Sequence, residues 1–335
     1  MTESFDYKSA GVDIEAGEQT VKNIKEKVRS TFTAGVMTDI GKFGGFFALD
    51  PSKYNDPVLV SSIDGVGTKL KVAFMMNRHD TVGEDLVNHC INDILVGGAR
   101  PLFFLDYIGT GILEPEHVES LISGMVRGCR SAECALIGGE MAEMPGFYQA
   151  GEYDVAGCIV GIVEKQHIID GSRIQKGDVL VGLPSTGLHT NGYSMARKVL
   201  FDHCQYDVHT PIPDLDVTVG EALLAVHRCY LPVVDPLLGQ MDIRGMSHVT
   251  GGGIEGNTKR ILPEGRSLDI QWGNWPVPKI FQVIREKGQV PEKDMRRTFN
   301  LGIGYIFIVP KEDETALIGL LEKQGETPFR VGEVV

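Results

Sequence analysis

The sequence lacks a long apolar run, which argues against a membrane-spanning helix. The longest stretch built only from apolar residues and glycine is residues 301–309, far short of the about 20 that a helix needs to cross a bilayer. Runs of Lys or Arg are also missing, and the net charge is −13, from 32 Lys+Arg against 45 Asp+Glu. We therefore expect neither a membrane nor a nucleic acid as a partner.

None of the six cysteines belongs to a C-x-x-C pair, so the usual spacing for a zinc or disulfide framework is absent. Most lie within apolar periodic segments, where we expect buried, reduced thiols. The first residues, MTESFDYKSAGVD, are polar and acidic, and they do not have the pattern of a signal peptide. These features predict a cytoplasmic protein.

At 335 residues the chain is long for one hydrophobic core, which favours two domains. A polar stretch with turn signals at residues 166–177 predicts the boundary, giving domains at 1–168 and 169–335. Strands and helices alternate in both halves, which indicates α/β or α+β layers. The strands are expected at residues 57–63, 101–108, 134–137, 154–163, 179–183 and 302–309, with the fourth closing the first domain. The helices are expected at residues 69–76, 83–96, 115–131, 193–201 and 220–238. A further helix is expected to end at residue 261, and a terminal helix is expected after the last strand.

The most informative stretch is residues 64–69, DGVGTK, at the end of the first expected strand. Asp64 can hold a divalent cation, while Gly65 and Gly67 free the backbone to turn N–H groups toward phosphate oxygens. Thr68 follows, and Lys69 adds a positive charge. The pattern suits a metal-bound polyphosphate, although it is not a Walker A loop and an ordinary strand-to-helix turn is the alternative.

Two further acids lie at special places: Asp93 on the polar face of a helix, and Glu140 after Gly138-Gly139, the pair expected to end a strand. Hard cations such as Mg²⁺ take oxygen ligands from separate elements. Asp64, Asp93 and Glu140 could therefore converge on one site, or the last two could be ordinary surface acids.

His189 and Asn191 lie in a Ser/Thr/Gly-rich loop that follows the strand expected at residues 179–183. Such a loop can present a general acid or base and an amide that orients a substrate. A solvated or backbone-bonded histidine is the alternative.

Residues 251–256, GGGIEG, match the dinucleotide pattern G-x-G-x-x-G, but no full βαβ unit surrounds them. We reject a Rossmann site here. Glycines before a helix still offer backbone N–H groups to an anion, so a phosphate is plausible beside Thr250, and a bare helix-entry turn is equally compatible.

Taken together, these segments resemble the phosphoribosylformylglycinamidine cyclo-ligase family, the aminoimidazole ribonucleotide synthetases. The similarity runs nearly end to end and in order. It is carried by residues 7–13 (YKSAGVD), 44–46, 64–69, 92–93, 103–107, 138–146, 153–157, 189–194, 250–253 and 298–300.

The resemblance implies an α+β fold of two α/β-type domains, with the first domains of a homodimer pairing into an intersubunit β-barrel. It also implies a reaction of purine biosynthesis. ATP would phosphorylate the formyl amide oxygen of formylglycinamidine ribonucleotide, and an amidine nitrogen would then displace phosphate and close the imidazole ring.

The resemblance assigns roles to residues. Mg²⁺ would be held by Asp64, Asp93 and Glu140. ATP and its phosphates would contact Lys8, Asp64, Gly65, Gly67, Thr68 and Lys69, with Lys69 balancing charge during transfer. His189 and Asn191 would face the reacting amide or amidine. The ribonucleotide phosphate would lie at Thr250, Gly251, Gly252 and Gly253.

Alternatives from other classes remain at this point. Sister enzymes of the same ATP-binding superfamily, such as selenophosphate synthetase or thiamine-phosphate kinase, would use the same acids. A non-catalytic nucleotide-binding homologue would be expected to lack the site acids or the His189 loop, and this sequence keeps both.

Overall fold

The computed structural model describes residues 6–212 and 215–335, and the chain forms two compact units. Unit 1 comprises residues 1–91 and 101–162, and unit 2 comprises residues 92–100 and 163–335. From residue 163 onward the chain belongs to unit 2, whereas the domain boundary predicted from the sequence follows residue 168. The short segment 92–100 also belongs to unit 2, so a single boundary along the chain does not describe the division into units.

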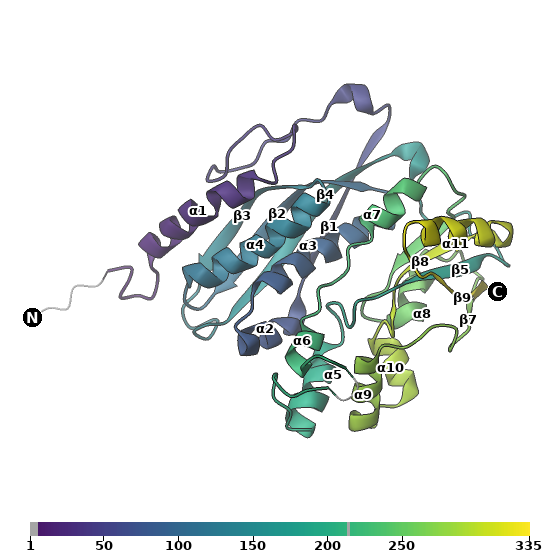
Figure 1. The fold of residues 1–335 in the computed structure, drawn as a ribbon. Helices are drawn as coiled ribbons and strands as arrows, with labels where there is room; N and C mark the ends of the chain where they lie inside the picture. The colour runs from purple at the N-terminus through teal and green to yellow at the C-terminus, as the bar shows by residue number, and fades with distance from the viewer. Residues whose placement is uncertain (1–5, 213–214) are drawn as a thin grey trace, which may run out of the picture. The chain divides into compact units, whose positions relative to one another are not determined.

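Unit 1 is built on a four-stranded sheet with the strand order β1-β4-β2-β3. Its strands are β1 (Pro57–Gly65), β2 (Arg100–Thr110), β3 (Ala135–Glu143) and β4 (Tyr153–Glu164), and its helices are α1 (Ile14–Arg29), α2 (Leu70–Met76), α3 (Asp80–Leu95) and α4 (Pro115–Ser131). Helices α3 and α4 cover one side of this sheet (Figure 1). They pack closely because Gly124 has no side chain: a Cβ there would lie 1.8 Å from the Asp80 carbonyl oxygen.

Strand β3 is longer than predicted, which corrects the expectation that Gly138-Gly139 would end it. The strand runs through both glycines to Glu143, paired in parallel with β2. Gly139 is needed for space rather than for a turn, because a Cβ there would lie 1.4 Å from Asp106 Oδ1 on the neighbouring strand. A glycine inside a strand often marks such a close approach.

Unit 2 is built on a five-stranded sheet with the order β6-β8-β5-β9-β7, and its neighbouring strands are antiparallel. The strands are β5 (Val179–Pro184), β6 (Gly245–His248), β7 (Leu268–Ile270), β8 (Ile303–Val309) and β9 (Phe329–Val334). The helices are α5 (Tyr193–Arg197), α6 (Val219–Leu223), α7 (Leu231–Val234), α8 (Gly253–Thr258), α9 (Lys279–Gly288), α10 (Glu292–Thr298) and α11 (Glu314–Lys323). Every residue of β8 is buried, as its uninterrupted apolar sequence requires.

The long helix predicted at residues 220–238 is wrong. The segment forms two short helices, α6 and α7, with non-helical residues between them. Pro232 and Pro236 each lack an N–H group, so neither can continue a helix in the interior. The non-helical stretch contains His227, which is fully buried. The helix predicted at residues 193–201 is also altered, since α5 passes into a π-helical segment, Lys198–His203.

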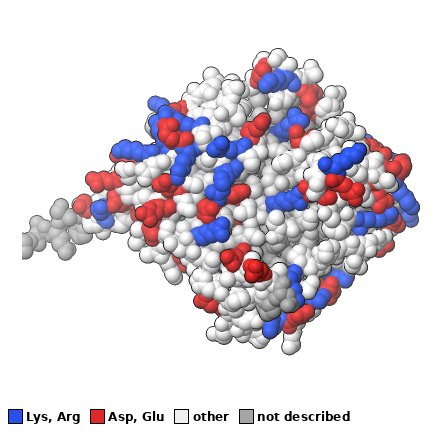
Figure 2. Space-filling model, viewed as in Figure 1, with Lys and Arg blue, Asp and Glu red and all other residues white. Residues whose placement is uncertain are grey.

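All six cysteines are free thiols, as predicted. Cys90, Cys129 and Cys134 are buried, whereas Cys158, Cys204 and Cys229 are half-buried. Among the described residues, no helix combines the length and the apolar character needed to cross a bilayer. On the face drawn in Figure 2, basic and acidic side chains are intermixed rather than gathered into a basic stripe.

Candidate active site

In unit 1 the loop after β1 has an open part and a closed part. Gly67 and Thr68 are exposed, and Gly67 has φ +62°, a conformation that favours glycine. Asp64 is partly exposed and already has two donors, its neighbour Gly65 N at 2.7 Å and His89 Nε2 at 2.8 Å. The carboxylate is therefore held in a fixed orientation beside the exposed residues Gly67 and Thr68.

Lys69 does not lie on the open side of this loop. Its side chain is fully buried, and its Nζ is 2.6 Å from Asp85 Oδ2 on α3, which is also fully buried. Burial lowers the pKa of Lys69, and the charge of Asp85 opposes that shift. The pair ties the loop to the helix, so in this conformation Lys69 acts as an internal counter-ion rather than as a surface charge.

The N-terminal motif lies against the loop that follows β3. Asp13 N donates to Glu143 Oε2 at 2.7 Å, and Leu113 N donates to Glu143 Oε1 at 2.8 Å. Lys8 is exposed and forms an ion pair of 2.6 Å with Asp13. The structure thus brings together two motifs, residues 7–13 and 138–146, that are about 130 positions apart in sequence.

Glu140 is exposed and lines a cavity of about 600 Å³ in unit 1. The walls come from α1, the glycine-containing loop at residues 39–45, and strands β2 and β3. The volume is in the range of small-ligand sites. Asp106 lies in the same wall, and burial raises the pKa of its carboxyl to about 7.

Within one chain, Asp64 and Glu140 are far apart, because β1 and β3 are the two edges of the sheet. Three strand spacings separate them, or about 14 Å. A single Mg²⁺ ion, with ligand distances of about 2.1 Å, does not bridge that gap directly. If both carboxylates bind metal in one chain, they bind different ions.

Asp93 belongs to the segment that groups with unit 2. Its Oδ1 accepts a hydrogen bond of 2.8 Å from His248 Nδ1, at the end of β6. A carboxylate can only accept in this contact, so the bond fixes the proton of His248 on Nδ1. Its predicted role as a metal ligand stays a prediction.

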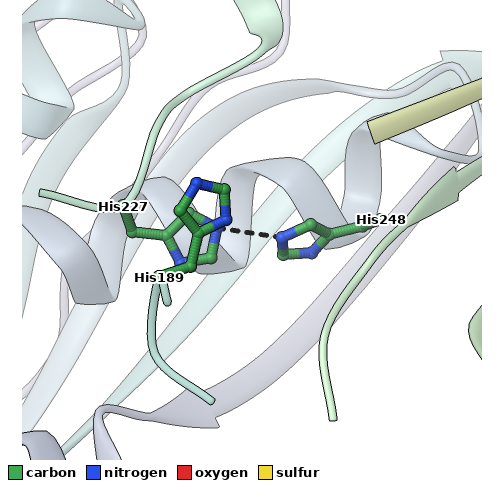
Figure 3. A group of neighbouring side chains, drawn as sticks. All are labelled: His189, His227 and His248. Carbon is green, nitrogen blue, oxygen red and sulfur yellow. Dashed lines mark hydrogen bonds between the residues drawn. The ribbon is translucent and has the colours of Figure 1, made fainter. Parts of the chain in front are cut away.

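His189 is buried and has φ +60°, an uncommon conformation for a residue other than glycine. Its Nε2 accepts a hydrogen bond from Thr186 N at 3.2 Å, and its ring stacks on that of His227, with centroids 4.1 Å apart and an interplanar angle of 16° (Figure 3). The third ring, His248, is joined to His227 by a hydrogen bond. His189 therefore faces the interior of unit 2.

Asn191 is the more open member of the same loop. It lies against residues 250–253, the glycine loop of unit 2. A Cβ on Gly251 would be 3.1 Å from Asn191 Oδ1. Gly251 and Gly252 are exposed, whereas the N–H groups of Gly252 and Gly253 already donate to the carbonyls of Arg297 and Thr250. The structure brings Asn191 and residues 250–253 together, but it leaves fewer backbone donors for an anion than the sequence pattern indicates.

Asn257 shapes this glycine loop and was missed from sequence. Its Nδ2 lies 3.2, 3.4 and 2.9 Å from the carbonyl oxygens of Thr250, Gly251 and Gly253, and its Oδ1 accepts from Thr250 Oγ1 at 3.0 Å. His227 and His248 were also missed. For His227 the one available signal was a histidine within an apolar stretch, and that signal is weak.

Three imidazoles in such proximity raise the question of a metal. His189, His227 and His248 offer nitrogen atoms within 4.8 Å of one another. The rings of His189 and His227 are nearly parallel, so the lone pairs of their nitrogen atoms lie in two nearly parallel planes. Ligands of one metal ion must instead point toward a common position. The observed geometry is that of a stacked, hydrogen-bonded cluster.

Comparison with known families adds the decisive observation. Residues 49–163 match the N-terminal domain of AIR synthase related proteins, and residues 175–335 match the C-terminal domain. The chain belongs to the AIR synthase-related family. The two matches cover the loop at residues 64–69, the His189 loop and the glycine loop.

Curated members of the family are similar over almost the whole length. The phosphoribosylformylglycinamidine cyclo-ligase of Trichlorobacter lovleyi is 53% identical over 98% of this chain and 94% of its own. The enzyme of the same name from Alkaliphilus metalliredigens is 51% identical over 98% and 95%.

Solved structures of other proteins share the fold at low sequence identity. Thiamine-monophosphate kinase from Stenotrophomonas maltophilia has a TM-score of 0.72 at 15% identity, covering 93% of each chain. The hydrogenase maturation protein HypE in complex with ATP has a TM-score of 0.66 at 15% identity, covering 95% of this chain and 86% of that one. These structural neighbours are thus far less similar in sequence than the cyclo-ligases.

Proposed function

We propose that this protein is an ATP-dependent cyclo-ligase that converts formylglycinamidine ribonucleotide to aminoimidazole ribonucleotide, with release of ADP and phosphate. The observation that carries the proposal is the similarity of over 50% identity, spanning both domains, to enzymes named for that reaction. The main alternative, a sister enzyme of the wider family, has a similar fold but only about 15% identity to support it.

The chemistry explains why ATP is needed. The formyl amide oxygen is a poor leaving group, and phosphoryl transfer from ATP converts it into phosphate, a good one. The amidine nitrogen then attacks the formyl carbon, the C–O bond breaks, and phosphate departs as the imidazole ring forms. Because nucleophile and electrophile belong to one molecule, correct positioning by the protein strongly favours closure.

For ATP we propose unit 1. The exposed backbone at Gly67 and Thr68, beside the half-buried Gly65, suits phosphate oxygens, and Lys8 is an exposed cation. The cavity beside Glu140 has the size of a nucleotide subsite. Lys69 supports the loop through its pair with Asp85, and a direct role of Lys69 in transfer would require that pair to open.

Mg²⁺ is part of the proposal. The partly exposed carboxylate of Asp64 and the exposed carboxylate of Glu140 are the hard oxygen donors that this ion prefers. When bound, Mg²⁺ would neutralise phosphate charge during transfer. The strand order favours separate ions for the two acids within one chain.

For the ribonucleotide we propose unit 2. Asn191 is half-buried beside the exposed Gly251, so its amide can orient a polar group of the substrate. Thr250 and the open part of the glycine loop are the proposed phosphate contacts. His189 acts from beneath the loop, where its ring sets the conformation of residues 189–191.

We also propose a homodimer formed through the sheet of unit 1. Leu59 and Ile63, two large apolar residues on the same face of β1, are 58% and 71% exposed. A second copy of this sheet would cover them. Ile63→Glu should shift the protein toward monomer in size-exclusion chromatography with light scattering, and an unchanged mass of the Ile63→Glu variant would contradict the proposed interface.

The experiment that tests the function is a paired assay. ADP release from Mg²⁺-ATP is measured with and without formylglycinamidine ribonucleotide, and aminoimidazole ribonucleotide is quantified in the same samples. We expect ADP release that depends on the substrate and matches the product one to one. ATP binding without either product would contradict the cyclo-ligase assignment.

A further inference from the structure

We propose that His227 is a positioning residue for the His189–Asn191 loop: it stacks under His189 and links Asn191, through Thr190, to a carboxylate-anchored pair of imidazoles. The inference rests on the proposed function for its kinetic test, and it assigns a role to a residue that does not belong to the predicted site.

The hydrogen bonds form one continuous chain inside unit 2. Asp93 Oδ1 and His248 Nδ1 are 2.8 Å apart, and His248 Nε2 and His227 Nε2 are 2.9 Å apart. His227 Nδ1 lies 3.2 Å from Thr190 Oγ1, and Asn191 Nδ2 lies 3.4 Å from the same hydroxyl. The chain therefore ends on the side chain that we propose contacts the substrate.

The carboxylate gives the chain a direction. Since Asp93 only accepts, His248 donates from Nδ1, and a neutral His248 then accepts at Nε2. His227 must donate from Nε2, which leaves its Nδ1 to accept from Thr190. Thr190 in turn accepts from the amide of Asn191. With both rings neutral, each tautomer is fixed by the next bond, as in other buried polar networks.

The backbone around His227 is itself held in place. Asn92 Nδ2 donates to Arg228 O at 2.8 Å, and Asn92 Oδ1 accepts from Tyr230 N at 2.9 Å. Asn92 Nδ2 also lies 3.3 Å from His227 Nε2, a longer approach than the 2.9 Å bond to His248. These contacts keep the segment extended where the sequence alone predicts a helix.

Stacking supplies the second contact to the loop. The rings of His189 and His227 lie nearly parallel at 4.1 Å, while Gly304 on β8 leaves room for them: a Cβ there would be 2.6 Å from His189 Cε1. His189 has a positive φ, so its backbone is in the left-handed region, which residues other than glycine rarely adopt. A fixed partner under the ring stabilises that conformation.

Three substitutions of His227 distinguish the effect of its ring stack on His189 from the effect of its hydrogen bonds. His227→Phe keeps a flat ring under His189 but removes both hydrogen bonds. His227→Gln retains a donor near the position of Nε2 for His248, and His227→Asn retains an acceptor near the position of Nδ1 for Thr190. His209→Gln is the matched control, because this exposed histidine lies in the same unit outside the network.

The readout is steady-state kinetics of the full chain, after the wild type has been shown to form aminoimidazole ribonucleotide. We expect His227→Phe to lower kcat by about tenfold, with the KM for ATP unchanged, and the Gln and Asn variants to recover part of the loss. His209→Gln should match the wild type. An inactive wild type would instead refute the proposed function, before any variant is compared.

Two results would overturn the inference. One is a wild-type kcat for His227→Phe. The other is one mole of transition metal per mole of purified protein, with activity lost to a chelator and restored by that metal, since the cluster would then be a metal site. If His227→Phe does not fold, Thr190→Val removes the hydroxyl that contacts both His227 and Asn191. It should raise the KM for the ribonucleotide, and unchanged constants would refute the proposed chain.

Discussion

The two units each place a glycine-containing loop after a strand, but they hold these loops by different means. In unit 1 the loop after β1 is held by charges: Asp64 bonds to His89, and Lys69 pairs with Asp85 in the interior. In unit 2 the loop after β5 is held by a stack and by hydrogen bonds through Thr190 and His227. The first suits an anionic, metal-bound ligand, and the second suits orientation of a substrate amide or amidine.

The difference has an energetic consequence. Removing one partner of a buried ion pair leaves an uncompensated charge, which is strongly destabilising. Removing one member of a neutral network leaves an unsatisfied polar group, which costs less. We therefore expect breaking the buried Lys69–Asp85 pair in unit 1 to cost more stability than breaking the neutral hydrogen-bond network in unit 2.

The largest expected effect is that of Asp85→Ala, which leaves the Lys69 ammonium buried without its carboxylate. We expect a loss of about 3–5 kcal/mol in the free energy of unfolding, measured by urea denaturation. Lys71→Ala is the control, because the Lys71–Glu152 pair is partly exposed and should contribute less than about 1 kcal/mol. Equal losses for the two variants would remove the contrast between buried and exposed charge.

Asp64→Asn should lower turnover by about 100-fold while changing the free energy of unfolding little, because an amide is a poor ligand for Mg²⁺. Asp154→Asn is matched to it: Asp154 is an exposed strand residue whose carboxylate also bonds to the next backbone N–H. Wild-type turnover and Mg²⁺-ATP affinity in Asp64→Asn would refute the metal assignment in unit 1.

In unit 2, Asn257→Ala should destabilise the protein by about 2 kcal/mol, because three carbonyl groups of the glycine loop lose their shared donor. The KM for the ribonucleotide should rise, and the KM for ATP should stay constant. An effect on the ATP constant alone would contradict the assignment of the ribonucleotide to this loop.

The smallest effect concerns pH and Asp106. Burial raises its pKa from an ordinary value of 3.8 to about 7, so the folded state binds the proton more tightly than the unfolded state. Stability should therefore fall as pH rises from about 4 to 7. Asp106 is partly accessible through the cavity, so we expect only about 1–2 kcal/mol over this range. Asp106→Asn should flatten the profile, and an identical slope in wild type and variant would contradict the shift.

Much of the fold could be predicted from the sequence, because its pattern is local. Strand β1 alternates in burial, and α4 begins at Pro115, near where the prolines and apolar periodicity placed them. The end of β3 could not be predicted, because Gly139 is required by Asp106 on another strand. The break between α6 and α7 depends on contacts of Asn92 with a segment about 136 residues away.

In the candidate site, too, some features follow from the local sequence and others depend on tertiary contacts. The sequence predicts which loops carry chemistry, but it could not show that Lys69 is buried or that His189 points inward. Those placements depend on Asp85 and His227, partners that no local pattern identifies. Residue types predict the chemistry that is available, whereas tertiary contacts decide which atoms remain free to perform it.

The most direct test of the central claim follows the formyl oxygen. Formylglycinamidine ribonucleotide carrying ¹⁸O in the formyl group is incubated with the protein, Mg²⁺ and ATP, and the released phosphate is analysed by mass spectrometry. Activation of the amide by phosphoryl transfer predicts one ¹⁸O atom in the phosphate for each aminoimidazole ribonucleotide formed. Unlabelled phosphate alongside that product would contradict the account.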